Sequence, residues 1–137
     1  MAFKDKEEFY KLIGMMVEKI NNDKPLYDKL ASANLTCTLQ ITNMDSTIVT
    51  VSAKNAKLEF EYGEPIIKPE ATVLGTDEIF AKFWQGKVNL LTAMATGKLK
   101  VGGAVASITK LLPRLSGCYP KWVEVLKEAG REDLIVK

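Results

Sequence analysis

The chain has 137 residues, 47% of them apolar, with 19 Lys and Arg against 17 Asp and Glu, two Cys and no His. This length predicts one globular domain over residues 1–137, because it suffices for one hydrophobic core and falls short of two. The absence of His excludes Ser-His-Asp and Cys-His catalysis and removes the usual imidazole ligands of zinc, while Cys37 and Cys118 are too few for a four-thiolate site. We therefore expect no catalytic residue, no metal site and no cofactor.

The net charge of +2 creates no whole-protein field that would favour nucleic acid as a partner. Residues 1–11 are rich in charge, whereas a secretory signal needs an apolar stretch. No apolar run approaches the roughly 20 residues that span a bilayer, and two Cys suit a reducing compartment. The sequence thus predicts a cytoplasmic protein without a nucleic-acid partner.

The N-terminal half has the pattern of a helix followed by three strands. Apolar residues recur at helical spacing over residues 6–21, just after Asp5 and Glu8, which have the spacing of a capping pair. The period then changes to two, and apolar and polar side chains alternate over residues 35–42, 47–54 and 57–62. This alternation predicts an antiparallel meander with one face buried and the other exposed to water.

The C-terminal half combines short strands with short helices. A strand over residues 71–74 ends at Gly75, and Thr76 is the expected N-cap of the helix that follows it. The further expected elements are a short helix ending at Gly97, a strand over residues 98–101, a helix over residues 105–115 and a last helix after Pro120. The order of elements predicts an α+β domain in which helices cover one face of a sheet.

One motif in this half carries a family resemblance. A short helix is followed by Gly-Lys-Leu-Lys-Val and a glycine turn into an apolar helix, and the motif residues are Gly97, Lys98, Leu99, Lys100, Val101 and Gly103. This stretch resembles the sterol carrier protein type 2 family of non-specific lipid-transfer domains. The resemblance implies a mostly antiparallel five-stranded sheet whose helices enclose an apolar tunnel for a fatty acyl chain, acyl-CoA, sterol or phospholipid. It implies no catalysis.

The resemblance also places the tunnel beneath the helices of the C-terminal half. It implies ten lining residues, namely Phe80, Phe83, Trp84, Leu91, Met94, Leu99, Val101, Val105, Ile108 and Leu112. Any domain of this size needs a core of such residues, so each of them taken alone also fits ordinary packing. An empty tunnel of about 400 Å³ would cost on the order of 10 kcal/mol. A stable tunnel is therefore partly collapsed, hydrated or occupied.

Strand alternation places Leu99 and Val101 on one face and Lys98 and Lys100 on the other. Two interpretations of the lysines remain open: contact with lipid head groups or an anionic membrane surface, and an exposed sheet face kept soluble by charge. The two cysteines have different surroundings. Cys37 alternates with core residues and should be buried, whereas Cys118 follows a Gly in a loop-like segment and should be exposed.

The function predicted from the sequence is a carrier that sequesters a long-chain lipid or another apolar ligand, with transient contact to a membrane surface. The alternative is a non-catalytic interaction or dimerisation module that assists a lipid or isoprenoid enzyme, with a homodimer as one form. An enzyme that acts on lipids is a distant third hypothesis, since no nucleophile and base pair is recognisable.

Overall fold

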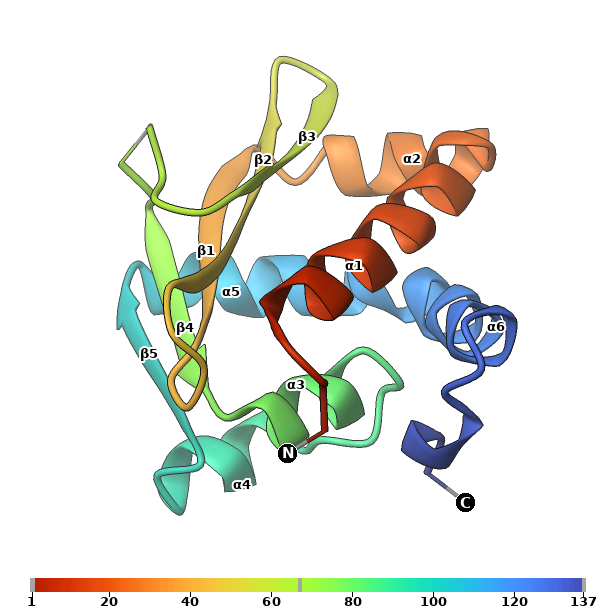
Figure 1. The fold of residues 1–137 in the computed structure, drawn as a ribbon. Helices are drawn as coiled ribbons and strands as arrows, with labels where there is room; N and C mark the ends of the chain where they lie inside the picture. The colour runs from red at the N-terminus through yellow and green to blue at the C-terminus, as the bar shows by residue number, and fades with distance from the viewer. Residues whose placement is uncertain (1, 67, 137) are drawn as a thin grey trace.

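The computed structural model describes residues 2–66 and 68–136. Two helices come first, α1 (Lys6–Asn21) and α2 (Lys24–Ala31) (Figure 1). The side chain of Asp5 accepts a hydrogen bond of 2.8 Å from the Glu8 amide, which confirms the predicted cap of the first helix. Asp23 caps α2 in the same way through the amide of Leu26.

Five strands form one sheet in the order β3-β2-β1-β4-β5. Their bounds are β1 (Leu35–Ile41), β2 (Thr47–Lys54), β3 (Lys57–Tyr62), β4 (Ala71–Gly75) and β5 (Leu99–Gly103). The neighbours pair antiparallel except β1 and β4, which run parallel. The sheet is therefore mostly antiparallel, as predicted, and the parallel pair arises because β4 lies beside β1 and not beside β3.

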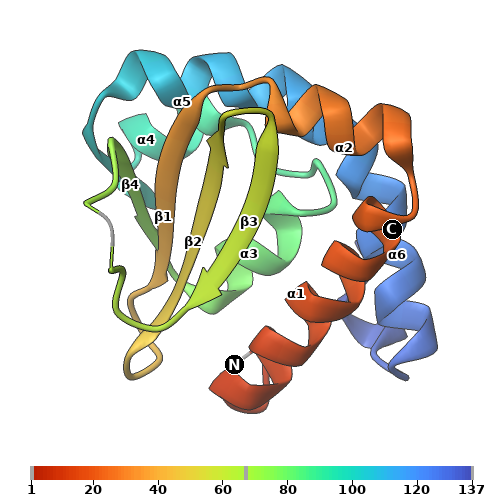
Figure 2. The same ribbon diagram turned by 90° about the horizontal axis from the view of Figure 1, so that it is seen from above.

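The remaining helices gather with α1 and α2 on one side of this sheet (Figure 2). They are α3 (Asp77–Phe83), α4 (Leu90–Ala95), α5 (Val105–Leu111), the 3-10 helix η1 (Leu112–Cys118), α6 (Tyr119–Glu128) and the 3-10 helix η2 (Glu132–Leu134). Thr76 caps α3 through the amide of Ile79, as the sequence predicted. Within the described part of the chain, none of the helices is both long and apolar enough to cross a bilayer.

The two faces of the sheet have opposite chemistry. On the inner face, the β1 residues Leu35, Cys37 and Leu39 are buried under the helices. On the outer face, Thr38 and Thr50 are opposite each other across β1 and β2, and their hydroxyl groups are 3.3 Å apart. Both threonines are also buried. The predicted alternation is confirmed, although the outer face is less wet than its polar composition indicates.

Two expectations for the C-terminal half were wrong. The helix expected over residues 105–115 ends at Leu111 and continues as the 3-10 helix η1. Cys118 is 1% exposed, because η1 runs directly into α6 and leaves no loop at this cysteine.

Gly103 is the last residue of β5. Its φ is +76°, and a Cβ atom at this position would lie 2.4 Å from the Glu70 carbonyl oxygen. Only glycine fits this turn.

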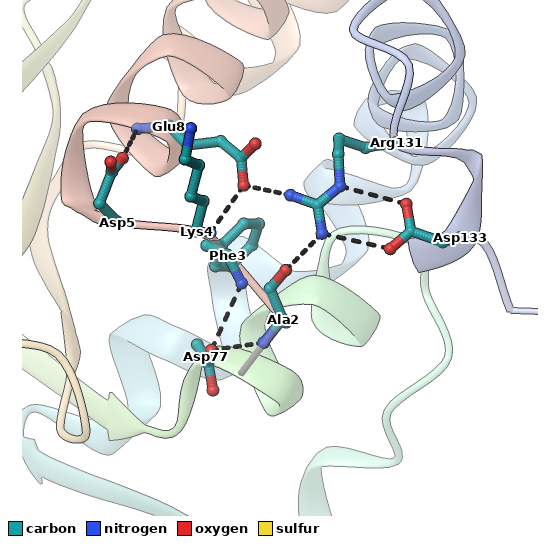
Figure 3. A network of polar contacts seen from close by, with 8 residues as sticks. All are labelled: Ala2, Phe3, Lys4, Asp5, Glu8, Asp77, Arg131 and Asp133. Carbon is teal, nitrogen blue, oxygen red and sulfur yellow. Dashed lines mark hydrogen bonds and ion pairs between the residues drawn. The ribbon is translucent and has the colours of Figure 1, made fainter.

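A cluster of polar contacts ties α1, α3 and the segment after α6 together (Figure 3). The guanidinium of Arg131 donates to the Ala2 carbonyl oxygen at 2.6 Å, to both carboxylate oxygens of Asp133 at 3.1 and 3.2 Å, and to the carboxylate of Glu8. Hydrogen bonds to Asp133 and Glu8 raise the pKa of Arg131 above its ordinary value. The guanidinium of Arg131 therefore stays charged at neutral pH.

The same cluster contains a buried carboxylate. Asp77, the first residue of α3, is 0% exposed and accepts hydrogen bonds from the amides of Ala2 at 2.6 Å and Phe3 at 3.4 Å. Its other oxygen accepts from the Asn43 side chain at 2.8 Å. We call the cluster formed by the following residues the polar clamp: Ala2, Phe3, Glu8, Asp77, Arg131 and Asp133.

Candidate functional site

An apolar cavity lies between the inner face of the sheet and the helices. Its wall combines residues of α2, β1, β2, β3, β4, α3, α4, α5 and η1. The lining residues are Leu30, Leu35, Cys37, Leu39, Val51, Ala53, Leu58, Phe60, Val73, Phe83, Trp84, Leu90, Ile108, Leu111, Leu115 and Cys118. Because the wall draws on residues 30 to 118, it exists only in the folded chain.

The sheet supplies half of this wall through its two-residue period. Cys37, Val51 and Phe60 form one row across β1, β2 and β3, since Cys37 is opposite Val51 and Val51 is opposite Phe60. The helical half of the wall comes from short helices, both from their ends and from their middle turns. Trp84 is the C-cap of α3, and Leu90 is the first residue of α4.

The wall has little capacity for chemistry. Every described lining side chain is a hydrocarbon except the two thiols and the indole of Trp84. Burial raises the pKa of the Cys37 and Cys118 thiols to about 12, so both are protonated at neutral pH and neither is an activated nucleophile. The described residues also gather no cluster of His, Cys, Asp and Glu that would suit a metal ion. The arrangement favours binding of an apolar molecule.

The cavity is small in this conformation. Its volume is about 30 Å³. Pockets that hold small molecules are far larger, at roughly 300–1,000 Å³. At about 24 cal/mol per Å³, a void of this size costs less than about 1 kcal/mol. A long ligand therefore needs the wall to move outward, in line with the expectation that a stable tunnel is partly collapsed.

Three of the ten residues predicted to line the tunnel lie on this wall: Phe83, Trp84 and Ile108. Phe80 and Leu99 are buried elsewhere in the core, and Met94 and Val101 are half-buried beside it. Leu91 is 78% exposed and Val105 is 43% exposed, so neither contacts the cavity in this conformation. The side chain of Leu112 lies outside the described part of the structure.

The sequence reasoning assigned the sheet residues of the wall to an ordinary core. Leu35, Cys37 and Leu39 were recognised as the inward side of a strand, and the same alternation marks Leu58 and Phe60. Their inward orientation was visible in the period of two. Which inward residues border a void depends on the volume between layers, and the sequence period does not contain that information.

Lys98 and Lys100 point away from the cavity, as predicted. Both are exposed, while Leu99 between them is 1% exposed on the inner face. They lie along an open groove of about 510 Å³ that also contains Lys82 and Glu78. Three lysines and one glutamate make this groove positively charged.

The comparisons with known proteins agree with this fold. Residues 17–113 match the SCP-2 sterol transfer family. No curated protein matches the chain by sequence. The sterol carrier protein domain 2 of Helicoverpa armigera is 21% identical with a TM-score of 0.62, over 82% of this chain and 87% of that one. Sterol Carrier Protein 2 from Yarrowia lipolytica, in its apo form, is 20% identical with a TM-score of 0.61, over 81% and 89% of the two chains.

A third similar structure belongs to a much larger protein. The inverting sec-alkylsulfatase Pisa1 from Pseudomonas sp. is 20% identical with a TM-score of 0.56, over 64% of this chain. The matched region is 14% of the alkylsulfatase. At identities this low the similarity to all three structures establishes the fold, and the activity of the alkylsulfatase as a whole does not transfer with it.

Proposed function

Because the chain belongs to the SCP-2 sterol transfer family, we propose that it carries a long-chain lipid in the cavity between its sheet and its helices. The observation that supports this most directly is the wall itself, whose lining residues are apolar on both the sheet side and the helical side. No bond is made or broken in this function. The free energy of binding comes from removing the apolar ligand from water.

The energetics set an expected affinity range. Burying about 14 methylene groups contributes on the order of 11 kcal/mol before any cost is subtracted. Losing translational freedom and ordering the chain consume several kcal/mol of this gain. Opening the collapsed cavity consumes more. The expected dissociation constants are therefore micromolar to submicromolar, with weak selection among head groups.

The wall should open on its α4 and α5 side. Ala93 is the buried residue of α4, and Ile108 and Leu111 are those of α5, so these short helices are anchored by few side chains. We propose that a ligand displaces them outward and extends the cavity toward the predicted lining residues on α4, β5 and α5. These residues are Leu91, Met94, Leu99, Val101 and Val105, and the buried Phe80 of α3 belongs to the same predicted set.

Displacement of a fluorescent fatty acid by a series of fatty acids tests the proposal. Chains of about 6 to 18 carbons should bind with rising affinity, because each added methylene contributes up to about 0.8 kcal/mol until the cavity is filled. An affinity that does not change with chain length would contradict binding in the cavity.

A second candidate function has its own supporting observation. Leu91 is a large apolar side chain that is 78% exposed on α4 and is therefore accessible to another protein or to a second copy of this chain. Native mass spectrometry of freshly purified protein separates the two functions. A monomer with co-purified lipid favours the carrier, and a ligand-free dimer favours the interaction module.

A further inference from the structure

Among the described residues, the wall of the cavity contains one side-chain N–H without a hydrogen-bond partner. Trp84 is 1% exposed, and its indole Nε1 has no hydrogen-bond partner within residues 2–66 and 68–136. Buried indole N–H groups are usually paired, because an unpaired one has lost its water without gaining a protein acceptor. The donor of Trp84 therefore needs an explanation.

The neighbours of Trp84 offer no acceptor to this donor. Its ring packs edge-on against Phe83 at 5.4 Å between centroids, and lies tilted against Trp122 at 6.2 Å. The next residue, Gln85, uses its amide elsewhere: its nitrogen donates to the carbonyl oxygens of Ala81 and Leu134, and its oxygen accepts from the Val136 amide, each at 2.8 Å.

The side chains of the rest of the described wall contain no oxygen and no nitrogen. Apart from Trp84, its only side-chain heteroatoms are the sulfur atoms of Cys37 and Cys118, which are weak acceptors. The Cys37 thiol is directed to the carbonyl oxygen of Thr38, 3.8 Å away. A charged ligand group would find no counter-charge in this wall. A neutral oxygen that reached this part of the wall would find the indole N–H of Trp84 as its strongest side-chain donor, beside the weak S–H of Cys118.

We infer that the indole N–H of Trp84 is a specificity-determining donor that binds a neutral oxygen acceptor, a carbonyl or a hydroxyl, carried within the apolar body of the ligand. This inference rests on the proposed function, since it assigns the polar contact of a ligand in the same cavity. It narrows the ligand class to long apolar molecules that contain such an oxygen inside the cavity. A carboxylate or phosphate group of such a ligand should lie outside the cavity.

Trp122 provides a matched control within the same molecule. It is 0% exposed, and its Nε1 also lacks a partner among the described residues, but it does not line the cavity. Any effect of a ligand oxygen should therefore appear at Trp84 and be absent at Trp122.

The test uses two probe series of equal shape. The first consists of long-chain ketones with the carbonyl group moved along the chain. The second consists of the matching alkenes, in which a methylene group replaces the oxygen. Nuclear magnetic resonance of the isotope-labelled protein follows both indole N–H signals, and either Trp84→Phe or Trp122→Phe assigns them. At least one ketone should move the Trp84 proton downfield relative to its alkene, while the Trp122 signal responds equally to both.

Affinity gives a second measurement. The ratio of the affinity for that ketone to the affinity for its alkene should fall about fivefold in Trp84→Phe, which is the effect of one neutral hydrogen bond. The same ratio should be unchanged in Trp122→Phe. Since both probes feel the same change in cavity shape, their affinity ratio isolates the hydrogen bond.

The outcomes separate this inference from the proposed function. If both probe series bind but no ketone shifts Trp84 beyond its alkene, the carrier function stands and the assignment of Trp84 is overturned. If neither series binds, the carrier function fails and the inference fails with it.

Discussion

The polar clamp and the apolar cavity are connected through two rings, since Trp122 packs 6.4 Å from Phe3 of the clamp and 6.2 Å from Trp84 of the cavity wall. The two regions differ in whether their buried polar groups have hydrogen-bond partners. In the clamp, each oxygen of the buried Asp77 carboxylate accepts hydrogen bonds from within the fold. In the cavity wall, the N–H of Trp84 has no partner among the described residues, and about 30 Å³ is unfilled.

This difference indicates which part of the molecule holds the shape and which part adapts. Networks of fully satisfied polar groups are rigid, because any displacement exposes an unpaired buried group. Loosely packed apolar walls move at low cost, because the contacts they lose are weak and non-directional. We therefore expect a ligand to change the α4 and α5 side of the cavity and to leave the clamp unchanged.

Removing the carboxylate of Asp77 should destabilise the polar clamp. Asp77→Ala leaves the amides of Ala2 and Phe3 and the Asn43 side chain without their acceptor. The free energy of unfolding should fall by about 3 kcal/mol, measured by urea denaturation at neutral pH. The control is Asp133→Ala: that side chain is 64% exposed, so water screens its ion pair and its loss should lower the free energy of unfolding far less. Equal losses in the two variants would show that Asp77 has no special structural role.

Alkaline pH should destabilise the fold, because it ionises the two buried thiols of the cavity wall. Burial raises the pKa of Cys37 and Cys118 from 9.0 to about 12. A neutral acid with a raised folded pKa stabilises the fold fully below the unfolded pKa, and that stability is lost as pH rises from about 9 to about 12. Between pH 8 and pH 9.5 the two thiols together should lower the free energy of unfolding by about 1 to 2 kcal/mol.

The matched control replaces both thiols by alanine. Burial also raises the pKa of Tyr62 and Tyr119, and a hydrogen bond to Glu128 raises that of Lys19, so these groups add to the loss mainly above pH 10. The decline up to pH 9.5 should therefore nearly disappear in the double variant. A decline of unchanged size would mean that water reaches the thiols and that the wall is not dry.

Local signals in the sequence were enough to predict most of the fold. Asp5 and Thr76 cap their helices because a side-chain oxygen reaches an amide three residues later, a contact that depends only on nearby residues. Leu35 and Leu39 lie on the inner face because the strand period is two. Such rules act over a few residues, so the bounds of the helices and strands were largely recovered.

The long-range features were not predictable in the same way. Asp77 and Ala2 are 75 residues apart in the chain, and no periodicity links an acidic residue to a distant backbone amide. The exposure expected for Cys118 was wrong, because a Gly-Cys-Tyr-Pro segment has the composition of a loop and nonetheless continues as helix. The cavity wall depends on how closely two layers approach, which is a property of the assembled core.

Filling the cavity should remove the feature that distinguishes it from the clamp. Ala53 lines the cavity and is 1% exposed, so Ala53→Leu adds three carbon atoms to a space of about 30 Å³. Affinity for a long-chain fatty acid should fall about tenfold, because the ligand must now displace a larger side chain. Displacement of the fluorescent fatty acid measures the loss. Ala33→Leu is the control, since Ala33 is buried outside the cavity wall. A similar loss in both variants would point to general overpacking.

The last and smallest effect concerns the outer groove, which belongs to neither region and tests whether delivery is separate from storage. Lys98→Glu with Lys100→Glu should slow ligand transfer to anionic vesicles about fivefold at low salt, because a brief encounter realises only part of the roughly 1 kcal/mol of attraction that each lysine contributes at an anionic surface. Ligand affinity should change little, since both side chains point away from the cavity and neither lines its wall. Lys29→Glu with Lys127→Glu makes the same change of net charge at exposed positions outside the groove. If attraction at the groove guides delivery, the first pair alone slows transfer, and high salt removes the difference by screening. Equal transfer rates for both pairs would assign Lys98 and Lys100 to a solvated sheet face, and contact with the membrane would then have to occur elsewhere, for instance at the exposed Leu91 on α4.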